Sequence, residues 1–159
     1  MTNAHRLDPG GTAPLFERLI DTEPRQGGEA YPYRLHTVED MVRSIGRGIA
    51  HLIDTRRPVD IHAVPREEAL TVREYGLPDI AQLSPRSHDD RQLLARTLVR
   101  VISAYEPRLT GVAVAVEPVP TELDRMRARV TAGIRIGRVM QPVSFALMLG
   151  PGPTEAVAP

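Results

Sequence analysis

The spacing of hydrophobic residues changes once along this chain, at Pro107. Before it, apolar residues recur every three or four positions, which is typical of helices. After it, apolar and polar residues alternate, and six apolar residues keep that alternation from Met126 to Ile136, which predicts a half-buried strand. Helices followed by strands predict an α+β domain in which N-terminal helices pack on a small C-terminal antiparallel sheet of about three strands.

The clearest predicted helix starts after Thr37. Thr37 and Asp40 have the spacing of a capping box, and Pro58 lies just beyond the helix end. Gly46 and Gly48 lie inside this helix, where each costs about 1 kcal/mol relative to Ala, so we expect packing to offset that cost or the close approach of another helix to need them. One apolar stripe runs along it, formed by Val38, Val42, Ile45, Ile49 and Leu52.

Three more helices are predicted. A short amphipathic one follows Pro14, with Leu15, Phe16, Leu19 and Ile20 as its stripe. A second runs from Pro65 to Tyr75, with Ala69, Leu70 and Val72 facing inward and Gly76 ending it. Asp89 or Asp90 caps the last, which Pro107 ends.

The strand half contains three alternating segments, at residues 112–116, 126–136 and 143–149. Their succession predicts an antiparallel meander, and Gly133 marks a possible bulge. Residues 13–150 are expected to form one domain, with a Gly- and Pro-rich linker at 21–35. Residues 1–12 read as a flexible N-terminal arm and 151–159 as a flexible Pro-rich tail.

Composition excludes several functional classes. Twenty Arg balance twenty acidic residues, which argues against a general nucleic-acid binder and against docking on anionic membranes. The chain has no Cys, so disulfides and thiolate chemistry are excluded. Its apolar runs are too short to cross a bilayer, and no secretory signal precedes them, so we expect a cytoplasmic protein without membrane insertion.

No pattern of catalytic or metal-binding residues stands out, so the sequence predicts no catalytic residue, metal or cofactor. The five His lie too far apart for a helical metal pair: His5, His36, His51, His62 and His88. No nucleotide-binding or hydrolase motif occurs. The acidic pairs Glu67–Glu68 and Asp89–Asp90 are adjacent, so their side chains diverge and cannot flank one bond.

The most distinctive segment is Glu106, Pro107, Arg108 and Leu109, which follows the last helix. Arg108 could bond the open carbonyls of that helix end, pair with Glu106, or pair across an interface. On physical grounds alone, a helix cap with exposed charges explains the segment. The turn Tyr75–Asp79 is likewise structural on these grounds.

Four segments in order resemble one family. They are Leu15–Leu19, Ser44–Arg57, the turn Tyr75–Asp79 and the Glu-Pro-Arg segment Glu106–Leu109, with Pro142–Phe145 fitting the closing strands. The chain resembles the TssE family of type VI secretion system baseplate wedge proteins, which is similar to a short wedge subunit of contractile-phage baseplates and was once labelled lysozyme-like. Ile53–Asp54 departs from the Leu-Asn of the family, and the linker has no counterpart there.

The resemblance implies a structural role without enzymatic activity. It implies TssF and TssG as wedge partners, TssB and TssC as sheath partners, and Glu106–Leu109 as partner-binding residues. An exposed sheet edge can accept a strand from a partner, so we expect one edge of the C-terminal sheet to start the sheath, although the sequence does not say which strand is the edge.

Three other functions remain open at this stage. The protein could serve a related phage tail or extracellular injection system, because relatives there share the Glu-Pro-Arg segment. The old family label suggests a glycan hydrolase, which would need two carboxylates facing each other across a cleft. A regulatory adaptor would instead bind one signalling protein.

Overall fold

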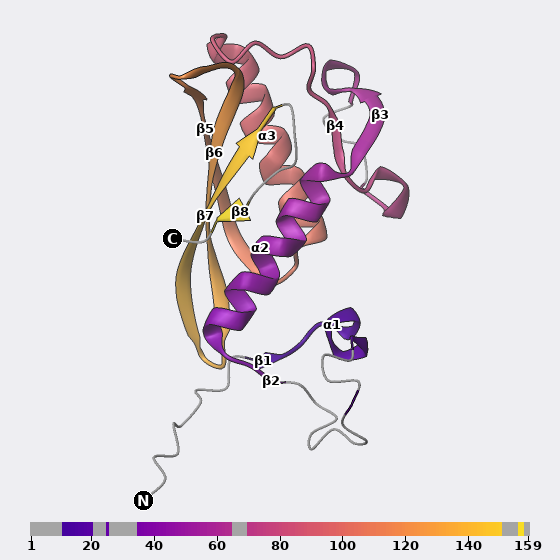
Figure 1. Cartoon of the computed structure of the whole chain (residues 1–159), viewed down its shortest axis with the longest axis vertical. Coiled ribbons are helices and arrows are strands. Elements are labelled where there is room, and N and C mark those ends of the chain that lie inside the picture. The colour runs from indigo at the N-terminus through magenta and orange to yellow at the C-terminus, as the bar shows by residue number, and fades with distance from the viewer. Residues whose placement is uncertain (1–10, 21–24, 26–34, 65–69, 151–155, 158–159) are drawn as a thin grey trace, which may run out of the picture.

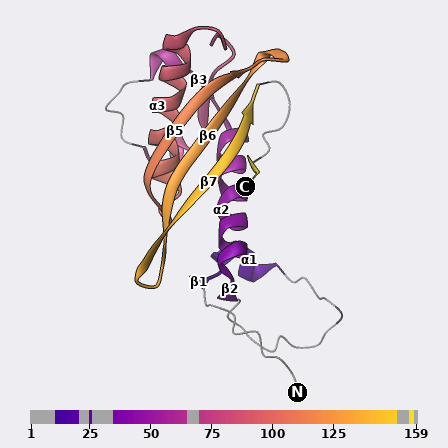
Figure 2. The same cartoon turned by 90° about the vertical axis from the view of Figure 1, so that its left-hand side faces the viewer.

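The computed structural model describes residues 11–20, 25, 35–64, 70–150 and 156–157. A β-sheet forms one layer, and the helices α2 (Val38–Asp54) and α3 (His88–Tyr105) lie side by side on one of its faces (Figures 1 and 2). None of the described elements covers the opposite face of the sheet (Figure 2). The predicted α+β architecture with a C-terminal antiparallel sheet is confirmed.

Helix α2 begins and packs as the sequence predicts. Thr37 Oγ1 accepts a hydrogen bond from the Asp40 N–H at 3.1 Å, and Asp40 Oδ2 accepts one from the Thr37 N–H at 3.3 Å, which forms the predicted capping box. The predicted stripe faces the core, with Ile45, Ile49 and Leu52 buried.

Helix α3 starts with a different cap from the one predicted. Ser87 is the cap, because its Oγ accepts a hydrogen bond from the Asp90 N–H at 3.2 Å. The Asp90 carboxylate turns away to accept the Ser84 N–H at 2.9 Å, so neither Asp89 nor Asp90 fills the cap position. The helix ends at Tyr105, two residues before Pro107, as predicted.

The predicted helix 65–75 is wrong in its described part. Only one 3-10 turn, η2 (Val72–Glu74), forms there, and Val72 is 89% exposed instead of facing inward. Thr71 and Glu74 close a capping box around that turn, and Tyr75 is already extended, so no second turn follows. Residues 65–69, including Ala69, lie outside the described residues.

A small parallel pair, which the sequence did not predict, lies beyond the helices. Strand β3 (Arg56–Asp60) pairs with β4 (Leu77–Asp79), and the 3-10 turn η1 (Ile61–Ala63) follows β3. Both strands lie on the side of the helices away from the main sheet (Figure 1).

The main sheet follows the chain order β5 (Leu109–Val119), β6 (Glu122–Ile136), β7 (Val139–Leu149) and β8 (Ala156–Val157), and every neighbouring pair is antiparallel. The predicted meander is therefore confirmed, with longer strands and a short fourth one. The predicted alternation in β6 is also confirmed, because Ala128, Val130 and Ile134 are fully buried while Arg127 and Arg129 are exposed.

The bulge lies on β5, opposite the stretch of β6 before Gly133. The register passes from the pair Thr110–Gly133 to the pair Ala113–Thr131, so β5 has two residues where β6 has one. Gly111, with φ of 64°, supplies the left-handed residue of this bulge. Gly133 instead leaves room for its neighbours, since a Cβ there would lie 2.8 Å from Met140 Cε and 3.3 Å from Thr110 Oγ1.

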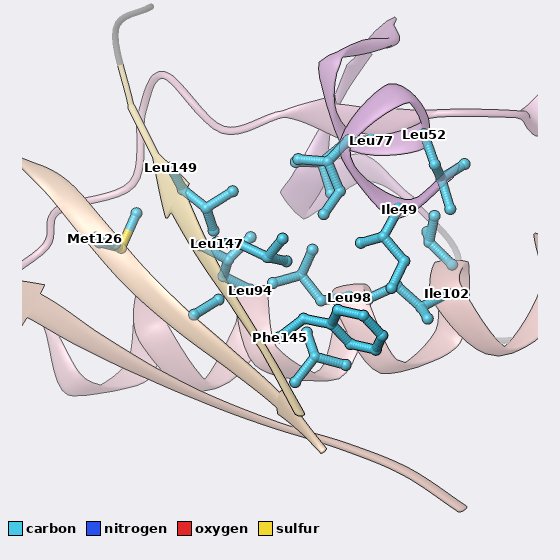
Figure 3. Close-up of a cluster of buried hydrophobic side chains, with 14 of the residues drawn as sticks. Ile49, Leu52, Leu77, Leu94, Leu98, Ile102, Met126, Phe145, Leu147 and Leu149 are labelled. Carbon is cyan, nitrogen blue, oxygen red and sulfur yellow. The ribbon is translucent and has the colours of Figure 1, made fainter. Parts of the chain in front are cut away.

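The core fills the space between the sheet and the two helices (Figure 3). Phe145 and Leu147 of β7 meet Leu98 of α3, Ile49 of α2 and Leu77 of β4 there, all fully buried. Apolar burial of this kind stabilises the fold by about 25 cal/mol per Å² removed from water.

The N-terminal segment lies at one end of α2. Strand β1 (Gly11–Thr12) pairs with β2 (Leu35–His36), and the short helix α1 (Leu15–Leu19) follows β1. Residues 1–10 of the predicted arm at 1–12, most of the predicted linker at 21–35 (21–24 and 26–34) and most of the predicted tail at 151–159 (151–155 and 158–159) lie outside the described residues. The described parts of the arm and of the tail are paired strands instead, because Gly11–Thr12 form β1 and Ala156–Val157 form β8.

Candidate functional site: a charged corner between three helices

The Glu-Pro-Arg segment turns the chain from α3 into β5. The Glu106 N–H bonds the Ile102 carbonyl at 2.9 Å and closes the helix, and the Leu109 N–H bonds the Glu106 carbonyl at 3.1 Å and closes the turn. Pro107 is exposed, while Glu106 and Leu109 are buried. The backbone of the turn thus directs the charged side chains of Glu106 and Arg108 back toward α2.

Glu106 and Arg108 form a two-pronged ion pair. Arg108 Nε donates to Glu106 Oε1 at 2.6 Å, and Nη2 donates to Oε2 at 2.5 Å. The Glu106 side chain is 8% exposed and that of Arg108 is 31% exposed. Two parallel, charge-assisted bonds offset the cost of burying the carboxylate, and they fix the plane of the guanidinium.

The pair continues into a chain of polar contacts that joins segments far apart in the sequence. Arg108 Nη1 donates to Ser44 Oγ at 2.9 Å, and Ser44 Oγ donates to Glu17 Oε1 at 2.7 Å. Glu17 also contacts His36 Nε2 and Arg47 Nη2, each at 3.2 Å. We call these six residues the corner network: Glu17, His36, Ser44, Arg47, Glu106 and Arg108.

Glu17 is held as an anion within this network. Burial opposes its ionisation, but hydrogen bonds from Ser44 and Arg47 and the positive charge of Arg47 outweigh burial and lower the pKa of the Glu17 carboxyl below its ordinary value. The network therefore fixes α1 to α2 through charge and hydrogen bonds.

A glycine makes room for the ion pair. A Cβ on Gly48 would lie 3.2 Å from Glu106 Oε2 and 3.6 Å from Arg108 Nη2. Gly48 of α2 therefore makes room for the side chains of this ion pair, which follow α3, and not for the closely approaching helix that was one of the two expectations. Gly46 is different, because a Cβ there would make ordinary contact with Phe145 at 3.6 Å.

Helix α1 turns its apolar stripe outward, away from the core. None of its residues is buried, and its large apolar side chains are between 58% and 80% exposed: Leu15, Phe16, Leu19 and the adjoining Ile20. The predicted amphipathic stripe exists, but it faces outward because Glu17 on the polar side makes the contact with α2. A contiguous apolar surface of this kind is typical of protein–protein contacts.

The turn Tyr75–Asp79 borders the same corner. Gly76 has φ of 109°, and a Cβ on it would lie 2.4 Å from the Thr55 carbonyl oxygen, so only glycine fits. The Tyr75 ring meets Tyr105 edge to face at 5.1 Å. Burial, together with the negative charge of Glu106, raises the pKa of Tyr75.

Sequence reasoning found two of the six members of the corner network. It singled out Glu106 and Arg108 and named their mutual pairing as one alternative, which the geometry confirms. It missed Glu17, His36, Ser44 and Arg47. The available signal was the pair Ser44 and Gly48, four residues apart on one side of α2, where two small residues leave space for side chains from elsewhere.

The residues of this site are suited to hydrogen bonds and ion pairs with another protein. In the described part of the chain, no group of three or more His, Asp or Glu is placed to hold a metal ion. The described helices also include none that is long and apolar enough to cross a membrane.

The family of baseplate wedge protein gp25 matches residues 39–142, which is more than half of the chain. The chain belongs to this family. The resemblance seen in the sequence is thereby confirmed. No curated protein matches the chain.

Membership in the gp25 family makes the protein a structural component of a contractile baseplate that contacts other baseplate components. The matched region contains Ser44, Arg47, Glu106 and Arg108, whereas Glu17 and His36 precede it. The corner network therefore links the family domain to the N-terminal segment, which carries the exposed apolar helix α1.

Proposed function

We propose that the chain is the TssE-type wedge subunit of a type VI secretion baseplate, a cytoplasmic protein without enzymatic activity. Its partners are TssF and TssG in the wedge and TssB and TssC in the sheath. The wedge domain is proposed to comprise residues 13–150, and strands β1 and β8 add Gly11–Thr12 and Ala156–Val157 to it. The observation that carries this proposal is the outer edge of β5.

The two edges of the main sheet differ. Part of the β7 edge is paired with β8, at Ala146 and Leu147, and Pro142 removes one N–H from the same strand. Among the described residues, no strand pairs with the outer side of β5, and its segment 112–117 contains no proline and a single charge, Glu117. A bulge at Gly111–Val112 and Pro118 bound this segment, but between them residues 113–117 have neither a bulge nor a proline, so they suit main-chain pairing with a sheath strand.

The wedge contact is proposed to use the Glu-Pro-Arg segment together with α1. Pro107 and part of Arg108 reach the surface beside the corner network. Helix α1 adds the exposed Leu15, Phe16 and Leu19. An apolar helix face beside a fixed guanidinium can bury apolar area and also orient a partner such as TssF or TssG.

Two observations disfavour the hydrolase alternative. Glu106 is engaged by Arg108, and Glu17 by Ser44, Arg47 and His36. A glycosidase acid needs a raised pKa, whereas the pKa of Glu17 is lowered. A peptidoglycan-turnover assay tests this alternative, since activity abolished by one carboxylate substitution would revive it.

Matched substitutions on the two sheet edges test strand addition. Ala113 and Ala115 on β5 lie opposite Thr131 and Arg129 of β6, and Ser144 and Ala146 of β7 lie opposite the same two residues. Placing two Lys on either edge therefore creates the same repulsion with Arg129. The β5 variant (Ala113→Lys, Ala115→Lys) should abolish sheath foci of labelled TssB, while the β7 variant (Ser144→Lys, Ala146→Lys) should keep them.

Both variants should still bind TssF–TssG in pull-downs, because the corner network is unchanged. Sheath formation by the β5 variant together with its loss in the β7 variant would contradict the choice of edge. Failure of the unmodified chain to bind TssF–TssG would contradict the type VI assignment and favour the phage-tail, injection-system or adaptor alternatives.

A further inference from the structure

The face of the main sheet that is turned away from the helices carries a row of arginines. Residues of β6 point alternately to the core and outward, and Arg127, Arg129 and Arg135 share the outward positions. All three are exposed. Because β6 lies between β5 and β7, the row runs along the middle of the uncovered face that Figure 2 shows.

The charges of this row are not balanced by neighbouring side chains. Within the described part of the chain, none of the three arginines forms an ion pair. The outward positions of β5 and β7 beside the row include one carboxylate, Glu117, which lies opposite Arg127 without forming an ion pair with it. Three guanidiniums against one carboxylate leave this face positively charged.

Small side chains flank the row on both sides. Ala113 and Ala115 of β5 and Ser144 and Ala146 of β7 occupy the outward positions beside its middle part. A helix with its side chains is about 10–12 Å wide, and neighbouring strands lie about 4.8 Å apart, so one helix would cover all three strands. The small residues let the backbone of such a helix approach the sheet.

The spacing of the arginines matches one face of a helix. Strand residues advance by about 3.3 Å, so Arg129 and Arg135 lie about 7 and 26 Å along β6 from Arg127. Helix residues advance by about 1.5 Å, so positions i+4 and i+18 lie about 6 and 27 Å from position i. With about 3.6 residues per turn, these three positions point within about 40° of one another. Carboxylates at these positions of one helix can therefore reach all three arginines.

We propose that the outward face of the main sheet is a docking surface for an acidic helix of a partner protein. Carboxylates on one face of that helix pair with Arg127, Arg129 and Arg135, and arginine binds carboxylates in a two-pronged geometry. This contact goes beyond the wedge and sheath contacts proposed above, because it uses side chains of β6 and neither the backbone edge of β5 nor the corner network.

Other occupants fit this face less well. The described helices of this chain have no two carboxylates four residues apart, so a second copy does not supply such a helix from its described part. Twenty Arg are balanced by twenty acidic residues, so the whole chain lacks the positive field that favours nucleic acid.

An unbiased selection tests the proposal. A phage-displayed library of single helices with one randomised face is panned on the full chain and counter-selected on the variant Arg129→Glu, Arg135→Glu. Enriched helices should carry Asp or Glu four residues apart on one face. The absence of any enriched helix, or enrichment of helices without carboxylates, would overturn the proposal.

Affinity measurements use one labelled, enriched helix. The variant Arg129→Glu, Arg135→Glu changes exposed side chains, and it should weaken binding at least about tenfold in fluorescence anisotropy. The control is Arg86→Glu, Arg96→Glu, which reverses two exposed charges away from this face and should leave the affinity within about twofold. Thermal melts check that both variants fold, and equal losses of affinity would overturn a local site.

A rearranged peptide tests the helical spacing. It has the same composition as the enriched helix, but its carboxylates are spread around the helix, and it should bind at least about tenfold more weakly. Equal binding of the two peptides would mean that net charge alone drives the contact, and would overturn docking of one helix face.

Two further measurements distinguish the other occupants. Labelled duplex DNA should bind the unmodified chain more weakly than the enriched helix does, and sedimentation should show the same association state for the unmodified chain and for Arg129→Glu, Arg135→Glu. Tighter binding of DNA that this variant loses would assign the face to phosphates, and self-association that it loses would assign the face to a second copy. Either result would overturn the proposal.

Discussion

The apolar core and the corner network hold neighbouring parts of this protein by opposite physical means. In the core, Phe145, Leu98 and Ile49 contribute apolar area, and any well-packed side chain of similar volume would serve. In the corner network, each contact is directional and shared, as with Ser44 Oγ, which accepts from Arg108 and donates to Glu17. The core therefore determines stability, whereas the corner determines where α1 lies.

The largest expected effect comes from the core. Phe145→Ala removes the largest fully buried side chain and leaves a cavity between β7 and α2, so it should destabilise the fold by about 3–5 kcal/mol. Urea denaturation followed by circular dichroism measures this loss. A change below about 1 kcal/mol would contradict the central packing of Phe145.

Breaking the corner should cost less than breaking the core. Arg108→Ala leaves the Glu106 carboxylate buried without its partner, which costs up to about 3–5 kcal/mol for a fully buried pair. Because the Arg108 side chain is partly exposed, we expect about 2–3 kcal/mol. The double variant Glu106→Gln, Arg108→Met should recover most of that loss.

The Arg108→Ala variant also distinguishes a structural role of Arg108 from a role in partner binding. Loss of TssF–TssG binding with an unchanged melting temperature would assign Arg108 to the interface, and lower stability with retained binding would assign it to the corner alone. Unchanged stability and unchanged binding would contradict both roles.

Two glycines of α2 allow a direct comparison, because Gly46 faces the apolar core and Gly48 faces the corner network. Gly46→Ala should stabilise the protein by about 1 kcal/mol, because alanine favours the helix and its Cβ meets Phe145 at an ordinary distance. Gly48→Ala should lose that gain, because its Cβ would press on the Glu106 carboxylate held by Arg108. Thermal melts measure the stability of the two variants. Equal gains in stability would show that the Glu106–Arg108 ion pair shifts to accommodate the added methyl group at no cost.

The smallest expected effect is a pH dependence from Glu17. Its pKa is lower in the folded protein than its ordinary value of 4.5, so the stability that its anion contributes is complete above that value and is lost as the pH falls below it. Glu17→Gln should lower stability at pH 7 by under about 1 kcal/mol, with the difference shrinking below pH 4.5. Melts at pH 7 and pH 3.5 provide the test, and a constant difference would contradict it.

The sequence predicts the local features of the fold but not the contacts of the corner network. The Thr37–Asp40 capping box and the alternation of β6 are local signals, and both are confirmed. The corner network joins Glu17, Ser44 and Arg108 across long stretches of chain, and periodicity carries no information about such contacts. The helix predicted through Val72 failed because the Thr71–Glu74 turn and Gly76 impose an extended path onto β4.

The central claim is that the outer edge of β5 pairs with a sheath strand. Hydrogen–deuterium exchange of the chain bound to its proposed partners TssF–TssG, with and without TssB–TssC, measures that pairing through the backbone amides. Outward-facing amides of residues 112–117 should exchange about a hundredfold or more slowly once the sheath is present, as expected for amides that gain stable backbone hydrogen bonds. Unchanged exchange at β5, with protection gained along β7 instead, would contradict the account.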